Sequence, residues 1–85
     1  MQAQVPSCKF LSIKTRVSSK GNEYTQLRVL SDGDVLTFFC SDDFKSQVNH
    51  YIDNGLSELM DCSLILEITS GQNGNLRVNP VDITV

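Results

Sequence analysis

A basic and aromatic hairpin in the first third of the chain carries the side chains best suited to binding chemistry. The run Arg16–Arg28, RVSSKGNEYTQLR, places a Lys-Gly-Asn turn between two segments of alternating polarity. Because side chains alternate across a strand, one predicted face carries Phe10, Lys14, Arg16, Tyr24, Gln26 and Arg28. The opposite, more apolar face carries Leu11, Ile13, Thr15, Val17, Thr25, Leu27 and Val29. Cations pair with phosphates while rings stack on unpaired bases, which is the chemistry of single-stranded nucleic-acid binding.

Charge is unevenly distributed along the chain. The net charge is −3, although domains that bind nucleic acid are usually basic. Residues 1–30 carry five cations against Glu23, a net charge of +4, whereas residues 31–85 carry Lys45 and Arg77 against nine acids, a net charge of −7. The basic part can hold phosphates locally, while the acidic part weakens long-range attraction.

Length and composition limit the classes of function. The 85 residues, 40% hydrophobic and 20% charged, predict a single domain over residues 1–85. No apolar stretch approaches the ~20 residues of a membrane span and the N-terminus lacks the pattern of a signal peptide, so we expect a cytoplasmic protein without a membrane partner. No nucleophile, paired carboxylate or phosphate-binding loop occurs at usable spacing, so we do not expect an enzyme.

Cysteine and acid spacing argues against a metal site. Cys8, Cys40 and Cys62 are widely spaced and form no Cys-x-x-Cys pair, which favours free structural thiols in a reducing compartment, without a disulfide. The acids between residues 32 and 43 lack the spacing of a calcium loop. The single histidine, His50, is expected to be a solvated helix residue. We therefore expect neither a metal nor a cofactor.

Periodicity predicts three strands, one helix and two further strands. Ser41 or Asp42 can cap the helix, Phe44 and Tyr51 lie on its apolar stripe as core residues, and Gly55 can end it. The apolar phase of the last strand changes near Asn79-Pro80, which predicts a bulge or edge break. The expected strands cover about 7–18, 23–30, 35–40, 62–69 and the segment from 76, and the helix covers about 42–54.

The order of these elements resembles the OB-fold. We therefore expect an all-β domain with one short helix, a five-stranded Greek-key barrel with the order β-β-β-α-β-β. Other small barrels remain open. In an OB-fold, ligands lie across strands two and three, between the first and the last interstrand loops. Here the first of these loops carries Lys20 and the second, residues 70–75, is rich in Gly and Asn.

The run Ser19–Thr25, SKGNEYT, resembles the first hairpin of the small single-stranded-DNA-binding proteins of filamentous phages. Those proteins carry a basic residue, a glycine and then an aromatic residue in an OB-like barrel that coats replicating single strands. The resemblance covers this hairpin, the chain length and the strand order. It implies that Lys20 and Arg16 contact phosphate and that Tyr24 stacks on a base. The helix is more typical of OB-folds of cellular or plasmid origin.

Non-enzymatic binding of single-stranded DNA, or of RNA, with little sequence preference is the leading hypothesis, because every base has a π-face. The candidate nucleic-acid-binding residues are Lys14, Arg16, Lys20, Tyr24, Gln26, Arg28, Phe39 and Arg77. Alternation leaves open the reverse assignment, in which Phe38 rather than Phe39 points outward.

The size of the chain and its exposed side chains also bear on assembly and on a second class of function. A small footprint makes a homodimer or a cooperative array useful, with its contact at the last strand or on the acidic rear. The alternative function is a protein-interaction adaptor of small-barrel fold, whose exposed aromatic residues and acidic face meet a protein partner.

Overall fold

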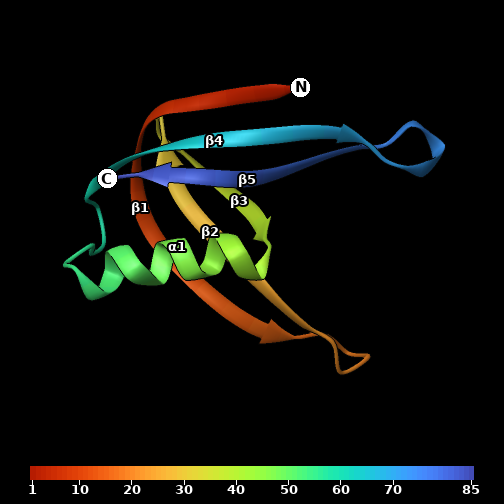
Figure 1. Cartoon of the computed structure of the whole chain (residues 1–85), viewed down its shortest axis with the longest axis horizontal. Coiled ribbons are helices and arrows are strands. Elements are labelled where there is room, and N and C mark those ends of the chain that lie inside the picture. Colours follow the sequence, from red (N-terminus) through yellow and green to blue (C-terminus); the bar gives the residue numbers. More distant parts are fainter.

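The computed structural model describes residues 1–85, apart from the side chain of Gln72. Across these residues it contains five strands, one α-helix and one short 3₁₀ segment (Figure 1). The elements are β1 (Gln2–Val17), β2 (Glu23–Ser31), β3 (Asp34–Cys40), α1 (Asp42–Asp53), β4 (Asp61–Ser70), η1 (Gln72–Gly74) and β5 (Leu76–Thr84). The predicted order and the position of the helix are confirmed, whereas β1 begins at Gln2 rather than near Ser7. No helix in the described chain is long and apolar enough to cross a membrane.

The strands form one antiparallel sheet in the order β3-β2-β1-β4-β5. Its central strand, β1, has two partners in succession. The first half of β1 pairs with β4, from Gln2 opposite Glu67 to Lys9 opposite Asp61, and the second half pairs with β2. The edge strands β3 and β5 lie close together, but no ladder joins them in the described chain, so the sheet is not closed.

Two register shifts bend β1 between its partners. One lies between Val5 and Cys8, and the other between Phe10 and Ser12. In each, β1 carries one residue more than the strand opposite, which kinks the strand and increases its twist. The bends direct β1 from the β4 ladder into the β2 ladder and curl the sheet towards α1 (Figure 1).

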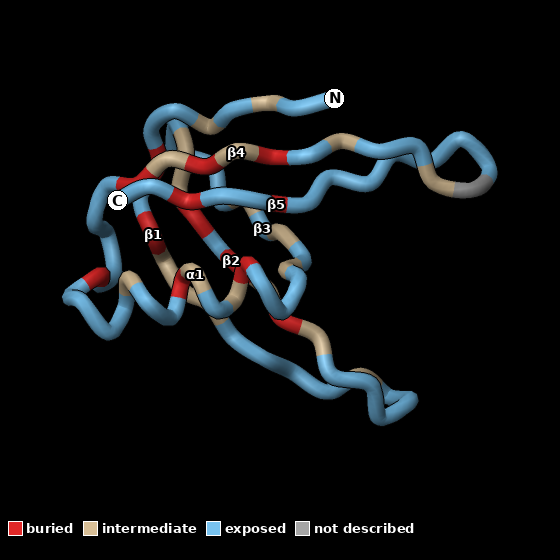
Figure 2. Tube along the Cα trace, viewed as in Figure 1, coloured by how far each residue is buried: buried red, intermediate tan, exposed pale blue. Residues whose placement is uncertain are grey.

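The core consists of one face of the sheet together with α1 (Figure 2). Its buried apolar residues are Cys8, Phe10, Leu27, Val29, Phe44, Val48, Leu56, Cys62, Leu64, Leu66 and Ile83. Phe44 is buried and Tyr51 packs against this core, as predicted for the helix stripe. The exposed residues of α1 face away from it.

Phe10 belongs to the core, and its predicted place on the outer face with Tyr24 is wrong. The extra residue, Leu11, changes the phase of β1, so that Phe10 opposite Val29 points to the same side as Ile13 opposite Leu27. Only 5% of Phe10 is exposed. Its backbone is also paired, because its carbonyl accepts from the N–H of Leu59 at 2.7 Å and its N–H donates to the carbonyl of Met60 at 2.9 Å.

Local sequence signals set the limits of α1. The backbone N–H of Phe44 donates to Ser41 Oγ at 3.2 Å, so Ser41 is the N-cap. Asp42 and Asp43 in the first turn stabilise the positive end of the helix dipole. After the helix, Gly55 takes φ +109°, a conformation that favours glycine and turns the chain away from the helix axis.

The predicted phase change in the last strand is confirmed as a bulge. Asp82 lies opposite Ile65 and Pro80 lies opposite Leu66, so Val81 is the extra residue in β5. Pro80 and Ile83 are both buried although they are three positions apart, an offset that would put them on opposite faces of a regular strand. The bulge therefore lets β5 contribute to the core on both sides of the break.

Two of the three free cysteines face each other within the core. Cys8 lies opposite Cys62 in the β1–β4 ladder, with 3.4 Å between the two Sγ atoms. Burial raises the pKa of the Cys8 thiol, raises the pKa of Cys40 to about 11 and raises the pKa of Cys62 to about 12. All three thiols are therefore protonated and weakly nucleophilic at neutral pH.

The raised thiol pKa values predict a loss of stability at alkaline pH. A thiol with a higher pKa in the folded chain keeps its proton where the unfolded chain releases it, so the free energy of unfolding falls as pH rises above 9.0, the ordinary value. Cys62→Ala should flatten this decline between pH 9.0 and about 12, as measured by chemical denaturation at several pH values. The two proteins differ only at residue 62, so parallel curves for the two proteins would contradict the prediction.

Candidate nucleic-acid interface

Pairing of β1, β2 and β3 gathers most of the predicted binding residues on the side of the sheet opposite the core. Together with Ser12 and Thr37, these residues form three neighbouring rows that run from β1 across to β3. The rows are Arg16–Tyr24, Lys14–Gln26–Phe39 and Ser12–Arg28–Thr37. We call these eight residues the outer face. Adjacent strands are about 4.8 Å apart, so a three-residue row spans roughly 10 Å between its first and last Cα atoms.

Two aromatic side chains of the outer face contact each other, half-buried Tyr24 on β2 and exposed Phe39 on β3. The rings of Tyr24 and Phe39 are in edge-to-face contact, with 6.0 Å between centroids and 65° between planes. Phe39 is 60% exposed, while Phe38 packs against the core. The question that the sequence left open therefore has an answer: Phe39 points outward and Phe38 inward.

The cations of the outer face have no carboxylate partner. Lys14, Arg16 and Arg28 are exposed, and the one ion pair among the described side chains joins Lys9 to Asp61 at 2.8 Å, outside this face. None of the eight residues of the outer face is acidic. Three positive charges are thus available to an anionic ligand beside two aromatic rings.

Lys20 lies at the tip of the β1–β2 hairpin, beyond the rows. The turn is held by hydrogen bonds from Gly21 N–H to the Ser18 carbonyl at 2.9 Å and from Ser18 N–H to the Asn22 carbonyl at 2.8 Å. Gly21 takes φ +83°, which favours glycine at this position. The hairpin projects past the core (Figure 1), and Lys20 is exposed. Lys20 therefore follows Lys14 and Arg16 as a third cation along this end of the chain.

Arg77 is not part of the outer face. It lies in β5 opposite Thr69, and a Cβ atom added at Gly71 would lie 3.4 Å from its Nε, which places the side chain against the β4–β5 hairpin. That hairpin and the β1–β2 hairpin project to the same side of the molecule (Figure 1). Arg77 can therefore meet only a ligand that extends beyond the rows of β1–β3.

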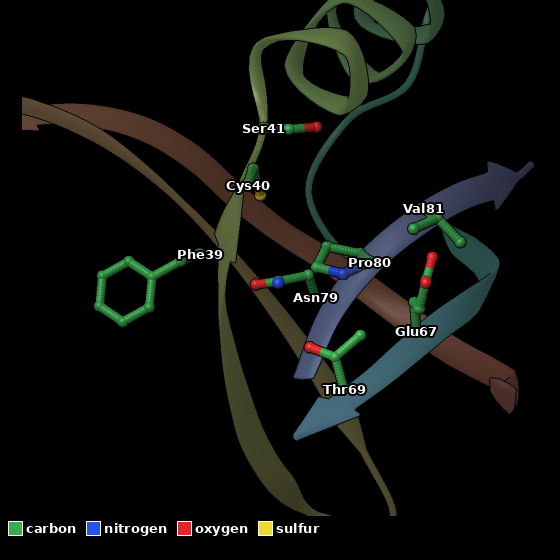
Figure 3. Close-up of a pocket in the computed structure, with 8 residues that line it drawn as sticks. All are labelled: Phe39, Cys40, Ser41, Glu67, Thr69, Asn79, Pro80 and Val81. Carbon is green, nitrogen blue, oxygen red and sulfur yellow. The ribbon is translucent and has the colours of Figure 1, made fainter. Parts of the chain in front are cut away.

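A groove that the sequence did not predict lies beside Phe39, where the end of β3 approaches β4 and β5 (Figure 3). It has a volume of about 460 Å³ and is lined by Phe39, Cys40, Ser41, Glu67, Thr69, Asn79, Pro80 and Val81. Alternation with the buried Leu64 and Leu66 marks Glu67 as outward-facing, but only the approach of the two edge strands places it near Phe39.

The described residues contain no group of three or more His, Cys, Asp or Glu side chains that could hold a metal ion. His50 is exposed on α1 and its ring lies against Tyr51. Comparison of the chain with protein family models, curated proteins and solved structures finds no match. The geometry of the outer face is therefore the basis for assigning a function to this chain.

The opposite orientations of Phe38 and Phe39 predict unequal effects on stability. Phe38→Ala should lower the free energy of unfolding by roughly 2–4 kcal/mol, because it removes a ring that packs on the core. Phe39→Ala should cost less than about 1.5 kcal/mol, because it removes chiefly the edge contact with Tyr24. Urea denaturation of the two variants measures the difference, and a larger loss for Phe39→Ala would place Phe39 in the core.

Proposed function

We propose that this protein is a non-enzymatic OB-type domain that binds single-stranded nucleic acid, principally DNA, and tolerates most sequences. The observation that carries the proposal is the pair formed by half-buried Tyr24 and exposed Phe39, on a face with three cations and no carboxylate. A ring left 60% exposed gains little from folding, whereas a base stacked on it covers its apolar surface.

The rows of the outer face suit the two parts of a nucleotide. Arg16 and Lys14 stand on β1, and Phe39 stands on β3. The three residues share the outer face, and β2 lies between the two strands. Phosphates would follow the β1 side, and bases would lie towards β3. Phosphate contacts carry no sequence information and every base can stack, so the arrangement favours sequence-tolerant binding. Gln26 lies between Lys14 and Phe39. Its amide N–H can donate a hydrogen bond to a phosphate or to a base, and its carbonyl oxygen can accept one from a base.

The topology supports an OB-type classification. β1 is shared between β2 and β4, α1 lies between β3 and β4, and β3 approaches β5. An OB-fold uses strands two and three, flanked by the β1–β2 and β4–β5 loops, to bind its ligands. Lys20 and Arg77 belong to these two hairpins and would act on a strand longer than the rows themselves.

The size of the outer face bears on assembly and setting. Its rows leave room for only a few nucleotides, so copies of the protein would have to bind side by side, as dimers or as a cooperative array, to cover a replicating strand. Buried free thiols suit a reducing cytoplasm. DNA replication in such a compartment is the process that this proposal favours.

Tyrosine fluorescence should report binding, because the chain has two tyrosines and no tryptophan. Tyr24 lies on the outer face and Tyr51 packs against the core. Oligo-dT should therefore quench part of the emission, and Tyr24→Ala should abolish the quenchable part while weakening binding by about 1–3 kcal/mol. A fluorescence titration combined with an independent binding measurement tests both effects.

Tyr51→Phe is the matched control for this titration. It removes the other phenol while keeping a ring against the core, so quenching by oligo-dT should persist. If oligo-dT and oligo-U leave the emission of the parent protein unchanged and no binding is detected, nucleic acid is not the ligand. A protein partner for the aromatic and acidic surfaces is then the better account.

Salt dependence should identify the cations that contact phosphate. Each contact contributes about −0.7 to the slope of log affinity against log salt for a single strand. Arg16→Ala, Lys14→Ala and Lys20→Ala should each lower affinity and make the slope shallower by roughly that amount. Binding isotherms at several salt concentrations provide the measurement.

Lys45→Ala serves as the control, because Lys45 lies on α1, outside the outer face. This variant should keep the slope of the parent protein. A slope that changes only when Arg77 is replaced would assign phosphate binding to the β4–β5 hairpin and contradict the role given to β1.

A further inference from the structure

The groove beside Phe39 has polar side chains that the stacking and phosphate contacts do not use. Glu67 of β4 lies opposite Asn79 of β5, and Thr69 is two residues further along β4, on the same side of the sheet. All three are exposed. No hydrogen bond between described side chains involves them. Figure 3 shows Asn79 projecting towards β3, the strand from which Phe39 extends.

Charge decides which part of a nucleotide fits this groove. Its lining contains one carboxylate, Glu67, and no cation, so it repels a phosphate. The three cations of the outer face lie beyond Phe39, on β1 and β2, while Arg77 of β5 stands opposite Thr69 and packs against the β4–β5 hairpin. A strand held with its phosphates over Lys14 and Arg16 and a base on Phe39 therefore directs base edges, rather than phosphates, towards Glu67.

We infer that this groove receives the hydrogen-bonding edge of a base and that Glu67 accepts a hydrogen bond from its exocyclic amino group. The inference rests on the proposed function and adds a base preference at one position of an otherwise sequence-tolerant site. An ionised carboxylate only accepts hydrogen bonds. Cytosine and adenine present an amino group, whereas thymine and uracil place a carbonyl oxygen there. Asn79 and Thr69 both donate and accept, so they accommodate either kind of base.

Oligo-dC and oligo-dU of equal length provide the sharpest comparison, since they differ in the hydrogen-bonding edge and lack the thymine methyl group. At slightly alkaline pH and fixed salt, the parent protein should bind oligo-dC about fivefold more tightly than oligo-dU. This ratio is at the lower end of the range for a specific base contact, because the groove is open to solvent. Oligo-dT should bind like oligo-dU, which shows that the methyl group is not the cause.

Glu67→Gln tests the residue directly. A carboxamide donates as well as accepts, so the ratio of the two affinities should fall from about five towards one. Glu58→Gln is the matched control: it removes the same charge from the exposed segment between α1 and β4, outside the groove. Both variants reduce repulsion of an anionic strand, but only Glu67→Gln should change the ratio.

The outcomes separate this inference from the proposed function. Equal affinities for oligo-dC and oligo-dU, with binding that depends on salt and on Tyr24, would overturn the inference and leave the proposed function intact. A preference for oligo-dC that survives Glu67→Gln would overturn the role of Glu67. Failure of the folded parent protein to bind any oligonucleotide would overturn both.

Discussion

The structure depends on one strand that must satisfy two partners. β1 pairs with β4 along its first half and with β2 along its second, so the sheet holds together only if β1 bends between the two ladders. The extra residues near Pro6 and at Leu11 supply those bends. The resulting curvature brings β3 towards β5, and their approach forms the groove beside Phe39.

The same bends divide the aromatic residues between core and surface. Because Leu11 is an extra residue, Phe10 lies in the core and Lys14 and Arg16 lie on the outer face. Burial of a phenylalanine side chain stabilises a fold by about 1.5–3 kcal/mol. Phe10 is 5% exposed and Phe44 is 1% exposed, so both stabilise the fold by about this amount. Phe39 is 60% exposed and therefore contributes much less. The Phe39 ring, edge-to-face with Tyr24, therefore leaves most of its apolar surface to solvent, and the proposed function assigns that surface to a base.

Features encoded by neighbouring residues could be predicted from the sequence, while features created by contacts between distant strands could not. The cap at Ser41, the helix stripe and the bulge at Val81 follow from local composition and phase. The phase of Phe10 did not, because neither glycine nor proline marks the bulge at Leu11. The early start of β1 and the place of Glu67 beside Phe39 depend on pairing with β4 and on the approach of β5 to β3, which one strand's sequence does not contain.

The net charge of −3 is compatible with the proposed binding of an anionic strand, because the charges are segregated on the scale at which salt screens them. The rows of the outer face span roughly 10 Å, close to the Debye length at physiological ionic strength, so a phosphate over Lys14 and Arg16 interacts mainly with those cations. More distant acids are largely screened. Glu67 lines the groove beside Phe39, at the border of the outer face, where its charge would repel a phosphate and favour a strand whose bases lie towards β3. Under the proposed function, Glu67 thus helps to orient the strand, while the other acids of residues 31–85 weaken its long-range attraction.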